Sequence, residues 1–345
     1  MGTEGIPATR DVPASSAVAP SKSLVLELVY IVGAHKSGAT VLGALLGMAP
    51  GVFYGGEIYR FPKPIFDPRE ADRKCSCGET VTTCPFWRSV RERAGRDPAF
   101  LSELRRGQRE FERWGRLPAT MLASARDAQD LRAHERRMGE FLGVLAAEDG
   151  ARTVVESSYS ALRAWLYGHE GASGVTARYL HLVRDGRGFL ASELALDADP
   201  GEGRKWFRLP PIVVLRWSAF NALALLFALR GPRQYLRVRY EDLLERPEET
   251  LTRLERFLSC DLSEARQRVA RGDPIPMRHI VAGNRLRLQG EFRLRKELAV
   301  PAPLPASVRA VFWTLAGPLA RGLGYRLSPR SAPTGPAPTR PDAPP

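Results

Sequence analysis

Residues 24–40, LVLELVYIVGAHKSGAT, decide the fold. Residues 24–32 are apolar and rich in β-branched side chains, which is typical of a buried strand. Gly33 and Gly38 enclose the turn that follows, and residues 40–48 have the apolar pattern of a helix. In such a turn the backbone N–H groups and the helix N-terminus point at one anion. The stretch therefore predicts a strand, an anion-binding loop and a helix.

The loop departs from the nucleoside-triphosphate pattern G-x-x-x-x-G-K-[ST] at one position. Gly33, Gly38 and Thr40 match, but Ala39 stands at the lysine position, and a lysine comes three residues earlier as Lys36. The cradle for one phosphate is kept, whereas the lysine that reaches the β- and γ-phosphates of ATP or GTP is lost. A P-loop nucleotide kinase or NTPase is therefore an alternative that the alanine argues against.

Strand-like runs alternate with helical segments along the rest of the chain. Short apolar runs at 152–156, 178–183 and 234–239 are expected strands. The alternation predicts an α/β fold of three layers, a central parallel sheet with helices on both faces. Residues 61–150 interrupt the rhythm with three cysteines and long Arg/Glu-rich helices. We expect a helical insertion there over the sheet edge, where open α/β sheets bind ligands.

The composition fits one folded domain with two tails. The chain has 345 residues, 44% hydrophobic and 26% charged, which are ordinary globular values. Residues 1–22 and 328–345 are rich in Pro, Ala, Ser and Thr and are predicted to be disordered, which leaves a domain at 23–327. Polar residues interrupt the longest apolar stretch, 211–229, so we expect a core or amphipathic helix rather than a membrane span. With no secretory signal and only four cysteines, the expected location is the cytoplasm.

The net charge of +13 predicts a surface that attracts anions. Of 51 basic residues only six are lysines, and a biased codon supply can produce the same arginine excess. A non-catalytic nucleotide or nucleic-acid binder is the second alternative. The chain lacks the aromatic and basic stacking motifs of single-strand binders, so no nucleic-acid partner is expected.

Five residues of the loop resemble the 5′-phosphosulfate loop (PKSGTT or PRSGTT) of the PAPS-dependent sulfotransferases. That family has a P-loop-like fold and transfers the sulfuryl group of 3′-phosphoadenylyl sulfate (PAPS) to a hydroxyl or, less often, an amine. Within the five, an alanine replaces one threonine, and a histidine precedes them in place of proline. The resemblance assigns donor binding to Lys36, Ser37, Gly38, Ala39 and Thr40.

Two further segments resemble the family's donor-binding motifs. Its 3′-phosphate motif is an arginine that ends a strand and a serine one helical stretch later, which Arg184 and Ser192 match in LVRDGRGFLAS. A guanidinium can hold a phosphate through two hydrogen bonds, and a hydroxyl adds a donor. The segment RYEDL at 239–243 matches the sequence after the family's last core strand. It adds Tyr240 to the predicted site, although a packed aromatic at a strand end explains that residue equally well.

The last matching segment is HIVAGNRLR at 279–287. It resembles the H-x-x-x-G-N-P-x-R stretch of the bacterial members, with Arg285 where proline is usual. The resemblance makes Arg287 a second contact to the 3′-phosphate. Together the matches run from about residue 28 to residue 290.

Sulfuryl transfer to an alcohol needs a base for the acceptor proton and positive charge where the leaving phosphate becomes negative. Lys36 suits the second task, because its ammonium can follow the bridging oxygen as charge develops there. The alternative is that Lys36 only neutralises the bound phosphate and has no special role in the transition state. Glu57 is the predicted base: it lies seventeen residues after Thr40 and past a Pro-Gly turn. Tyrosylprotein sulfotransferases are similar, with their catalytic glutamate at this kind of spacing. Glu57 could instead cap the next segment or pair with Arg60.

One motif is incomplete. Related bacterial proteins have a D-S-S-K-like stretch after the third strand, and here residues 156–159 read ESSY. Tyr159 therefore stands where the related proteins have a lysine that could assist the transferring group. Three alternatives remain open: Lys36 alone supplies the positive charge, another basic residue takes the place of the missing lysine, or the activity is weak.

Cys75, Cys77 and Cys84 lie within ten residues and could supply three ligands of a tetrahedral zinc site. The fourth ligand is missing from the local sequence. The other explanation, which the sequence favours, is that small buried thiols hold the insertion together. The predicted chemistry itself requires no metal. The acceptor is expected to be a small molecule (a sugar, phenol, lipid or natural product), and the oligomeric state is not predicted.

Overall fold

The computed structural model describes residues 26–112, 125–168, 173–194, 209–296 and 304–327. The two tails that are predicted to be disordered, 1–22 and 328–345, lie outside these described residues.

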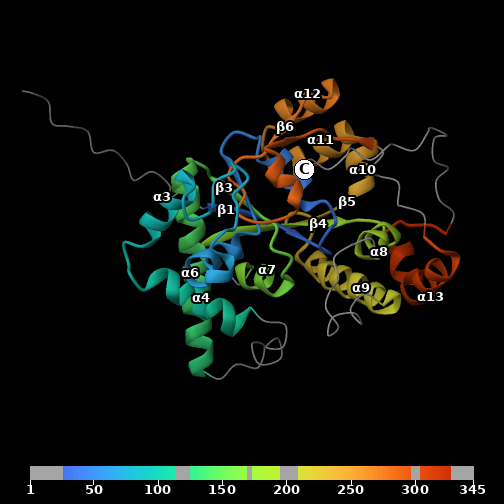
Figure 1. Cartoon of the computed structure of the whole chain (residues 1–345). Helices are drawn as coiled ribbons and strands as arrows, with labels where there is room; N and C mark the ends of the chain where they lie inside the picture. Colours follow the sequence, from blue (N-terminus) through green and yellow to red (C-terminus); the bar gives the residue numbers. More distant parts are fainter. Residues whose placement is uncertain (1–25, 113–124, 169–172, 195–208, 297–303, 328–345) are drawn as a thin grey trace, which may run out of the picture.

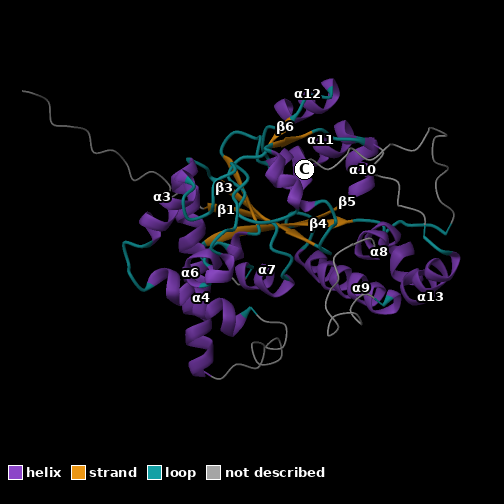
Figure 2. Cartoon of the chain, in the orientation of Figure 1, coloured by secondary structure: helices purple, strands orange, loops and turns teal. Residues whose placement is uncertain are grey.

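A five-stranded parallel sheet in the order β2-β3-β1-β4-β5 forms the centre of the molecule (Figure 2). Its strands are β1 (Leu26–Val32), β2 (Val52–Gly56), β3 (Thr153–Glu156), β4 (Val175–Val183) and β5 (Tyr235–Arg239). A second, antiparallel pair consists of β6 (Ile275–Pro276) and β7 (Glu291–Phe292). The predicted parallel sheet is confirmed.

Helices lie on both faces and at both ends of this sheet (Figure 1). The α-helices are α1 (Ala39–Leu46), α2 (Lys63–Phe66), α3 (Pro85–Ala94), α4 (Phe100–Phe111), α6 (Ala125–Asp149), α7 (Ala161–Tyr167), α8 (Gly186–Leu194), α9 (Pro210–Leu226), α10 (Tyr240–Glu245), α11 (Pro247–Leu258), α12 (Ser263–Arg271) and α13 (Ala306–Gly322). Short 3₁₀ turns are η1 (Ile58–Arg60), η2 (Pro68–Glu70), η5 (Phe227–Arg230) and η6 (Arg285–Gln289).

Strand β1 divides the core in two because its side chains alternate between the faces of the sheet. Leu28 and Tyr30 pack into the core under α3, α4 and α6, whereas Val29 and Ile31 pack under α1, α10 and α11. Both sets are buried, which is why the run is apolar without alternation.

Edge strand β2 is not predicted by the sequence pattern. Its five residues end in Gly55 and Gly56, and glycine weakens a strand in isolation. The strand forms because β3 pairs with it, from Val52 opposite Thr153 to Gly56 opposite Glu156. Its carboxyl end delivers Glu57 to the same sheet edge as the loop after β1.

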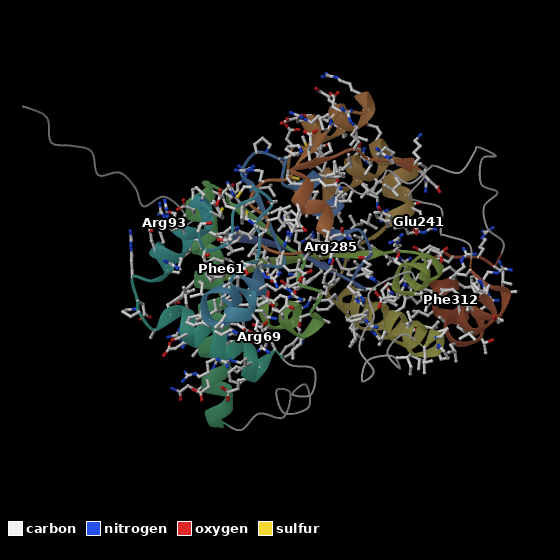
Figure 3. All side chains as sticks on the ribbon, viewed as in Figure 1. Phe61, Arg69, Arg93, Glu241, Arg285 and Phe312 are labelled. Atoms are coloured by element: carbon white, nitrogen blue, oxygen red, sulfur yellow. The ribbon has the colours of Figure 1, made fainter. Side chains whose placement is uncertain are left out.

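The predicted insertion, 61–150, has its own aromatic core. The ring of Phe61 lies 4.9 Å from that of Trp87 and 5.4 Å from that of Phe141 (Figure 3). Helix α6 also packs on β2 and β3, so this region supplies the crossover between those two strands as well as a cover over the edge.

A third cluster joins α8, α9 and α13 at the other end of the sheet (Figure 3). The ring of Phe312 lies 5.5 Å from that of Trp217 at its centre. Residues Pro210–Arg230, which comprise α9 and η5, have the length and apolar composition of a membrane-crossing helix; an 18-residue window within them has a mean hydropathy of 1.9, and 33% of that window is buried. Within the fold, α9 packs against α13 and α8.

Candidate active site

The loop between β1 and α1 has the strained backbone of an anion cradle. Gly33 and Gly38 have φ values of 135° and 94°, and Lys36 adopts a left-handed φ of 59°, which costs a side chain roughly 1–3 kcal/mol. The helix begins directly behind, with the Leu42 N–H donating to the Gly38 carbonyl. The N–H groups of the first helical turn therefore face the loop.

The residues predicted for the two ends of one nucleotide lie against each other. Arg184, at the carboxyl end of β4, donates from Nη1 to the Lys36 carbonyl at 2.9 Å. Lys36 Nζ donates to the Ser192 carbonyl in α8 at 3.0 Å. The loop and the Arg–Ser pair, which are about 150 residues apart in sequence, thus form one continuous surface.

Tyr240 is both a packed aromatic and a wall of this surface. The side chain is buried, with 6% exposure, and burial raises its pKa. The Arg184 guanidinium lies 5.3 Å from the centre of its ring. A Cβ at Gly38 would stand 2.2 Å from ring carbons Cδ2 and Cε2, so only glycine lets the loop approach this closely.

Glu193 and Arg216 belong to the site and were not predicted. Lys36 Nζ lies 2.6 Å from Glu193 Oε1, and Arg216 Nη1 lies 3.2 Å from Oε2. Burial acts to raise the pKa of Glu193, but hydrogen bonds from His35 and Lys36 lower it to about 2. Glu193 directly follows the predicted Ser192, the one signal that could have drawn attention to it. Arg216, on α9, is one of the polar residues that interrupt the apolar stretch 211–229, and that interruption is its signal in the sequence.

Glu57 lies just beyond β2, where its backbone N–H donates to the Ala282 carbonyl at 3.0 Å. Its carboxylate accepts a 2.7 Å hydrogen bond from Arg60 Nε, so the pairing that is the alternative to a catalytic role is present. The side chain keeps 13% exposure. Burial, together with the charge of Glu57, raises the pKa of Tyr159.

Arg287 is buried on the Glu57 side of the loop. Its exposure is 6%, and its Nε and Nη1 have no hydrogen-bond partner among the described residues. Burial lowers its pKa, and the charged groups acting on it include Arg73 and Glu57. Its segment reaches the loop through the Asn284 N–H, which donates to Thr40 Oγ1 at 3.2 Å. Buried N–H groups without a partner suit an anionic ligand.

Glu156, the first residue of the ESSY stretch after β3, has a structural role. Glu156 is fully buried and accepts a 2.7 Å hydrogen bond from Arg163 Nε. Tyr159 has a left-handed φ of 54°, and its ring lies edge-on to that of His35 at 6.4 Å. An aromatic side chain thus borders the loop where the related pattern has lysine.

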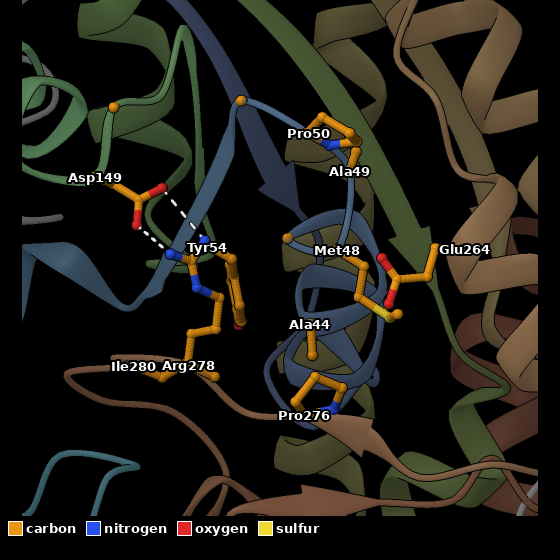
Figure 4. A pocket seen from close by; sticks show the side chains of 13 residues that line it. Ala44, Met48, Ala49, Pro50, Tyr54, Asp149, Glu264, Pro276, Arg278 and Ile280 are labelled. Carbon is orange, nitrogen blue, oxygen red and sulfur yellow. Dashed lines mark hydrogen bonds and ion pairs between the residues drawn. The ribbon is translucent and has the colours of Figure 1, made fainter.

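A separate cavity lies at the far end of α1 (Figure 4). Met48, Pro50 and Gly51 line it, beside the ion pair between Arg278 and Asp149 at 2.6 Å. The cavity adjoins the amino end of β2, whereas ligands of open parallel sheets bind at the carboxyl ends. It is therefore distinct from the candidate active site.

Comparisons with known proteins identify the family and the fold. A family model described as "Sulfotransferase family" matches residues 29–264. The chain is similar to the sulfotransferase domain of the Synechococcus PCC 7002 olefin synthase, with 21% identity, a TM-score of 0.52, and coverage of 88% of this chain and 96% of that one. It also resembles sulfotransferase STF9 from Mycobacterium avium, with 14% identity, a TM-score of 0.48, and coverage of 89% and 79%. Comparison with curated protein sequences finds no match. The predicted P-loop-like α/β fold is confirmed.

Proposed function

The chain belongs to the sulfotransferase family, and from that we propose that it transfers the sulfuryl group of PAPS to a hydroxyl group of a small-molecule acceptor. One observation carries the choice of donor. Arg184 and Lys36 are hydrogen-bonded at 2.9 Å, and Lys36 in turn reaches the Ser192 carbonyl at 3.0 Å. A nucleotide with phosphates at both 3′ and 5′ positions can span these two neighbouring groups.

We assign donor binding to the chain's own N–H and cationic groups. Residues 36–40 receive the 5′-phosphosulfate at the start of α1, and Arg184 and Ser192 receive the 3′-phosphate beside the Tyr240 ring. Arg287 has two buried nitrogens without a protein partner, which supports its role as an anion ligand. The resemblance assigns Arg287 to the 3′-phosphate; because Arg73 and Glu57 are among the charged groups that act on its guanidinium, we propose instead that Arg287 contacts the donor from the Glu57 side of the loop.

In the proposed reaction Glu57 accepts the acceptor's hydroxyl proton while that oxygen bonds to sulfur. The bond between sulfur and the bridging phosphate oxygen breaks, and the products are a sulfate ester and adenosine 3′,5′-bisphosphate. Lys36 neutralises the charge that develops on the leaving phosphate. In this role the Lys36 ammonium leaves its ion pair with Glu193, whose Oε1 lies 2.6 Å from Lys36 Nζ in the described structure. Arg216, which also pairs with Glu193, is the basic residue proposed to compensate for the lysine absent at Tyr159.

The acceptor and the cellular setting extend this proposal. The sulfotransferase domain of an olefin synthase among the similar structures supports a natural product as acceptor class. We propose a cytoplasmic enzyme that resembles the bacterial members and needs no metal for the transfer itself.

The test compares substitutions of two carboxylates, Glu57 and Glu70, that both lie near Arg60. Arg60 lies 2.7 Å from Glu57 and 3.9 Å from Glu70. Glu57→Gln is expected to lower kcat by roughly 10²–10⁴-fold, as for loss of a general base, while affinity for adenosine 3′,5′-bisphosphate stays at the wild-type value. Glu70→Gln is the matched control and keeps wild-type kcat. Equal losses in the two variants would mean that Glu57 acts only by holding Arg60, and failure of the wild type to bind the bisphosphate would refute the donor.

A further inference from the structure

Three thiols and one imidazole converge beneath the segment that carries Arg287. The ligand atoms of Cys75, Cys77, Cys84 and His279 all lie within 4.8 Å of one another. Cys77 Sγ is 3.6 Å from Cys84 Sγ, and His279 Nδ1 is 3.4 Å from Cys84 Sγ and 3.9 Å from Cys75 Sγ. The fourth ligand that the local sequence lacks thus arrives from almost 200 residues away.

These distances match the edges of the tetrahedron that four ligand atoms form around one zinc ion. Zinc bonds of about 2.3 Å to sulfur and about 2.0–2.1 Å to nitrogen give sulfur–sulfur edges of about 3.8 Å and sulfur–nitrogen edges of about 3.5 Å. The observed 3.6 Å between two sulfurs and 3.4 and 3.9 Å between sulfur and nitrogen fit this size. A disulfide needs about 2.05 Å, so the described thiols are free.

We propose that Cys75, Cys77, Cys84 and His279 bind one zinc ion in a closed structural site. Three sulfurs and one nitrogen form a soft, tetrahedral set, which selects zinc over magnesium or calcium. The four atoms lie close enough for one ion and leave no room for an iron–sulfur cluster. All four positions are filled by protein, so no position is open for a reacting water.

The backbone position of Cys84 suits a thiolate ligand. Cys84 occupies the N-cap position of α3, where the helix dipole favours a negative charge such as that of a thiolate.

Further contacts bring His279 to the cysteines. The Ile280 N–H donates to Ser76 Oγ at 2.7 Å, and the Ser76 N–H donates to the Ile280 carbonyl at 3.3 Å. The His279 ring stacks on Phe86, with centroids 5.1 Å apart and planes 4° from parallel. The preceding Arg278 is anchored to α6 through Asp149 (Figure 4). The imidazole is therefore fixed before a metal binds.

The site would couple the insertion to the wall of the candidate active site. Beyond His279, the Val281 N–H donates to the Gly55 carbonyl at 3.1 Å, and the Ala282 carbonyl accepts from the Glu57 N–H at 3.0 Å. Arg287 follows five residues later. A zinc ion bound to His279 would thus hold the segment that flanks Glu57, a positioning role that stands or falls independently of the proposed reaction.

Metal content tests the inference directly. We expect the full-length chain, purified without chelator and with reductant, to contain one zinc ion per molecule by elemental analysis. Cys77→Ser and His279→Ala are expected to lose it, whereas Cys260→Ser, the fourth cysteine outside the cluster, keeps it. Cys77 is exposed, so its replacement by serine leaves core packing intact.

Two measurements distinguish loss of metal from loss of fold. A zinc chelator is expected to lower the Tm of the wild type and of Cys260→Ser but to leave Cys77→Ser unchanged. Cobalt(II) added to the apoprotein should show the visible bands of a tetrahedral thiolate site, absent in Cys77→Ser. A zinc content near zero in wild type supplied with Zn²⁺ would overturn the site, as would a wild-type zinc content in folded Cys77→Ser.

Discussion

Gly38→Ala tests how closely the loop between β1 and α1 must approach Tyr240. Two costs add at this position. A side chain at φ 94° is strained by about 1–3 kcal/mol, and a methyl group 2.2 Å from two ring carbons forces the ring to move, typically at a further cost of about 1–3 kcal/mol. The free energy of unfolding should therefore fall by about 2–6 kcal/mol.

Gly324 offers a matched control because its φ is 93° and the nearest atom to a Cβ there is Arg239 Cδ at 3.9 Å. Gly324→Ala carries the backbone strain without the clash. Urea unfolding should therefore place Gly38→Ala about 1–3 kcal/mol below Gly324→Ala. Gly38→Ala should also weaken binding of adenosine 3′,5′-bisphosphate about ten- to a hundredfold in calorimetry, because the displaced ring shifts the Arg184 guanidinium and its charged hydrogen bond. Gly324→Ala should bind it normally.

A double-mutant cycle isolates the clash. In a Tyr240→Ala background no ring stands in the way, and Gly38→Ala should cost only its backbone strain. The coupling between positions 38 and 240 should then equal the clash, about 1–3 kcal/mol. Zero coupling, or equal losses for Gly38→Ala and Gly324→Ala, would refute the close approach as the reason for the glycine.

Three other predictions concern stability. Arg163→Met leaves Glu156 and Glu112 buried without the guanidinium that each contacts at 2.7 Å, so urea unfolding should show a loss of about 3–5 kcal/mol; a loss below about 1 kcal/mol would contradict the network. The pKa of Glu193 is lowered from 4.5 to about 2, so its stabilisation is present above pH 4.5 and is lost as the pH falls towards 2. Glu193→Gln should flatten that fall in stability, and an unchanged pH profile would contradict the pairing. Gly143 lies inside α6 with nothing within 4 Å of a Cβ, so Gly143→Ala should raise the free energy of unfolding by roughly 0.5–1 kcal/mol; a decrease would show hidden crowding.

Elements with a continuous apolar run could be predicted from sequence, and the edge strand could not. Residues 24–32 predict β1 (Leu26–Val32) to within two residues because both faces of that strand are buried. Residues 52–56 contain two glycines and form a strand only through pairing with β3. Their conformation depends on a partner about 100 residues away, which local propensity does not contain.

The same distinction separates the predicted site residues from the missed ones. Lys36, Arg184 and Ser192 belong to short motifs whose spacing reflects one strand, one turn and one helix. Arg216 and His279 gain their significance from contacts with His35 and Cys84, 181 and 195 residues away. Three cysteines alone favoured simple burial, and only folding supplies the imidazole that completes a ligand set.

The order of the strands bears on which carboxylate can act as base. In an in-line displacement the entering and leaving oxygens lie on opposite sides of the sulfur. Neighbouring strands of a sheet lie about 4.8 Å apart. The groups that follow β4 therefore lie on one side of the loop after β1, and those that follow β2, two strands from β1, lie about 10 Å from that loop on the other side. Burial raises the pKa of Glu241, as a base requires. But Glu241 follows β5, on the side of Arg184, and its oxygens accept from the Asp185 N–H and the Tyr325 hydroxyl. Glu57 follows β2, on the side opposite Arg184 and Ser192, which are proposed to hold the 3′-phosphate of the leaving nucleotide, and this supports Glu57 over Glu241.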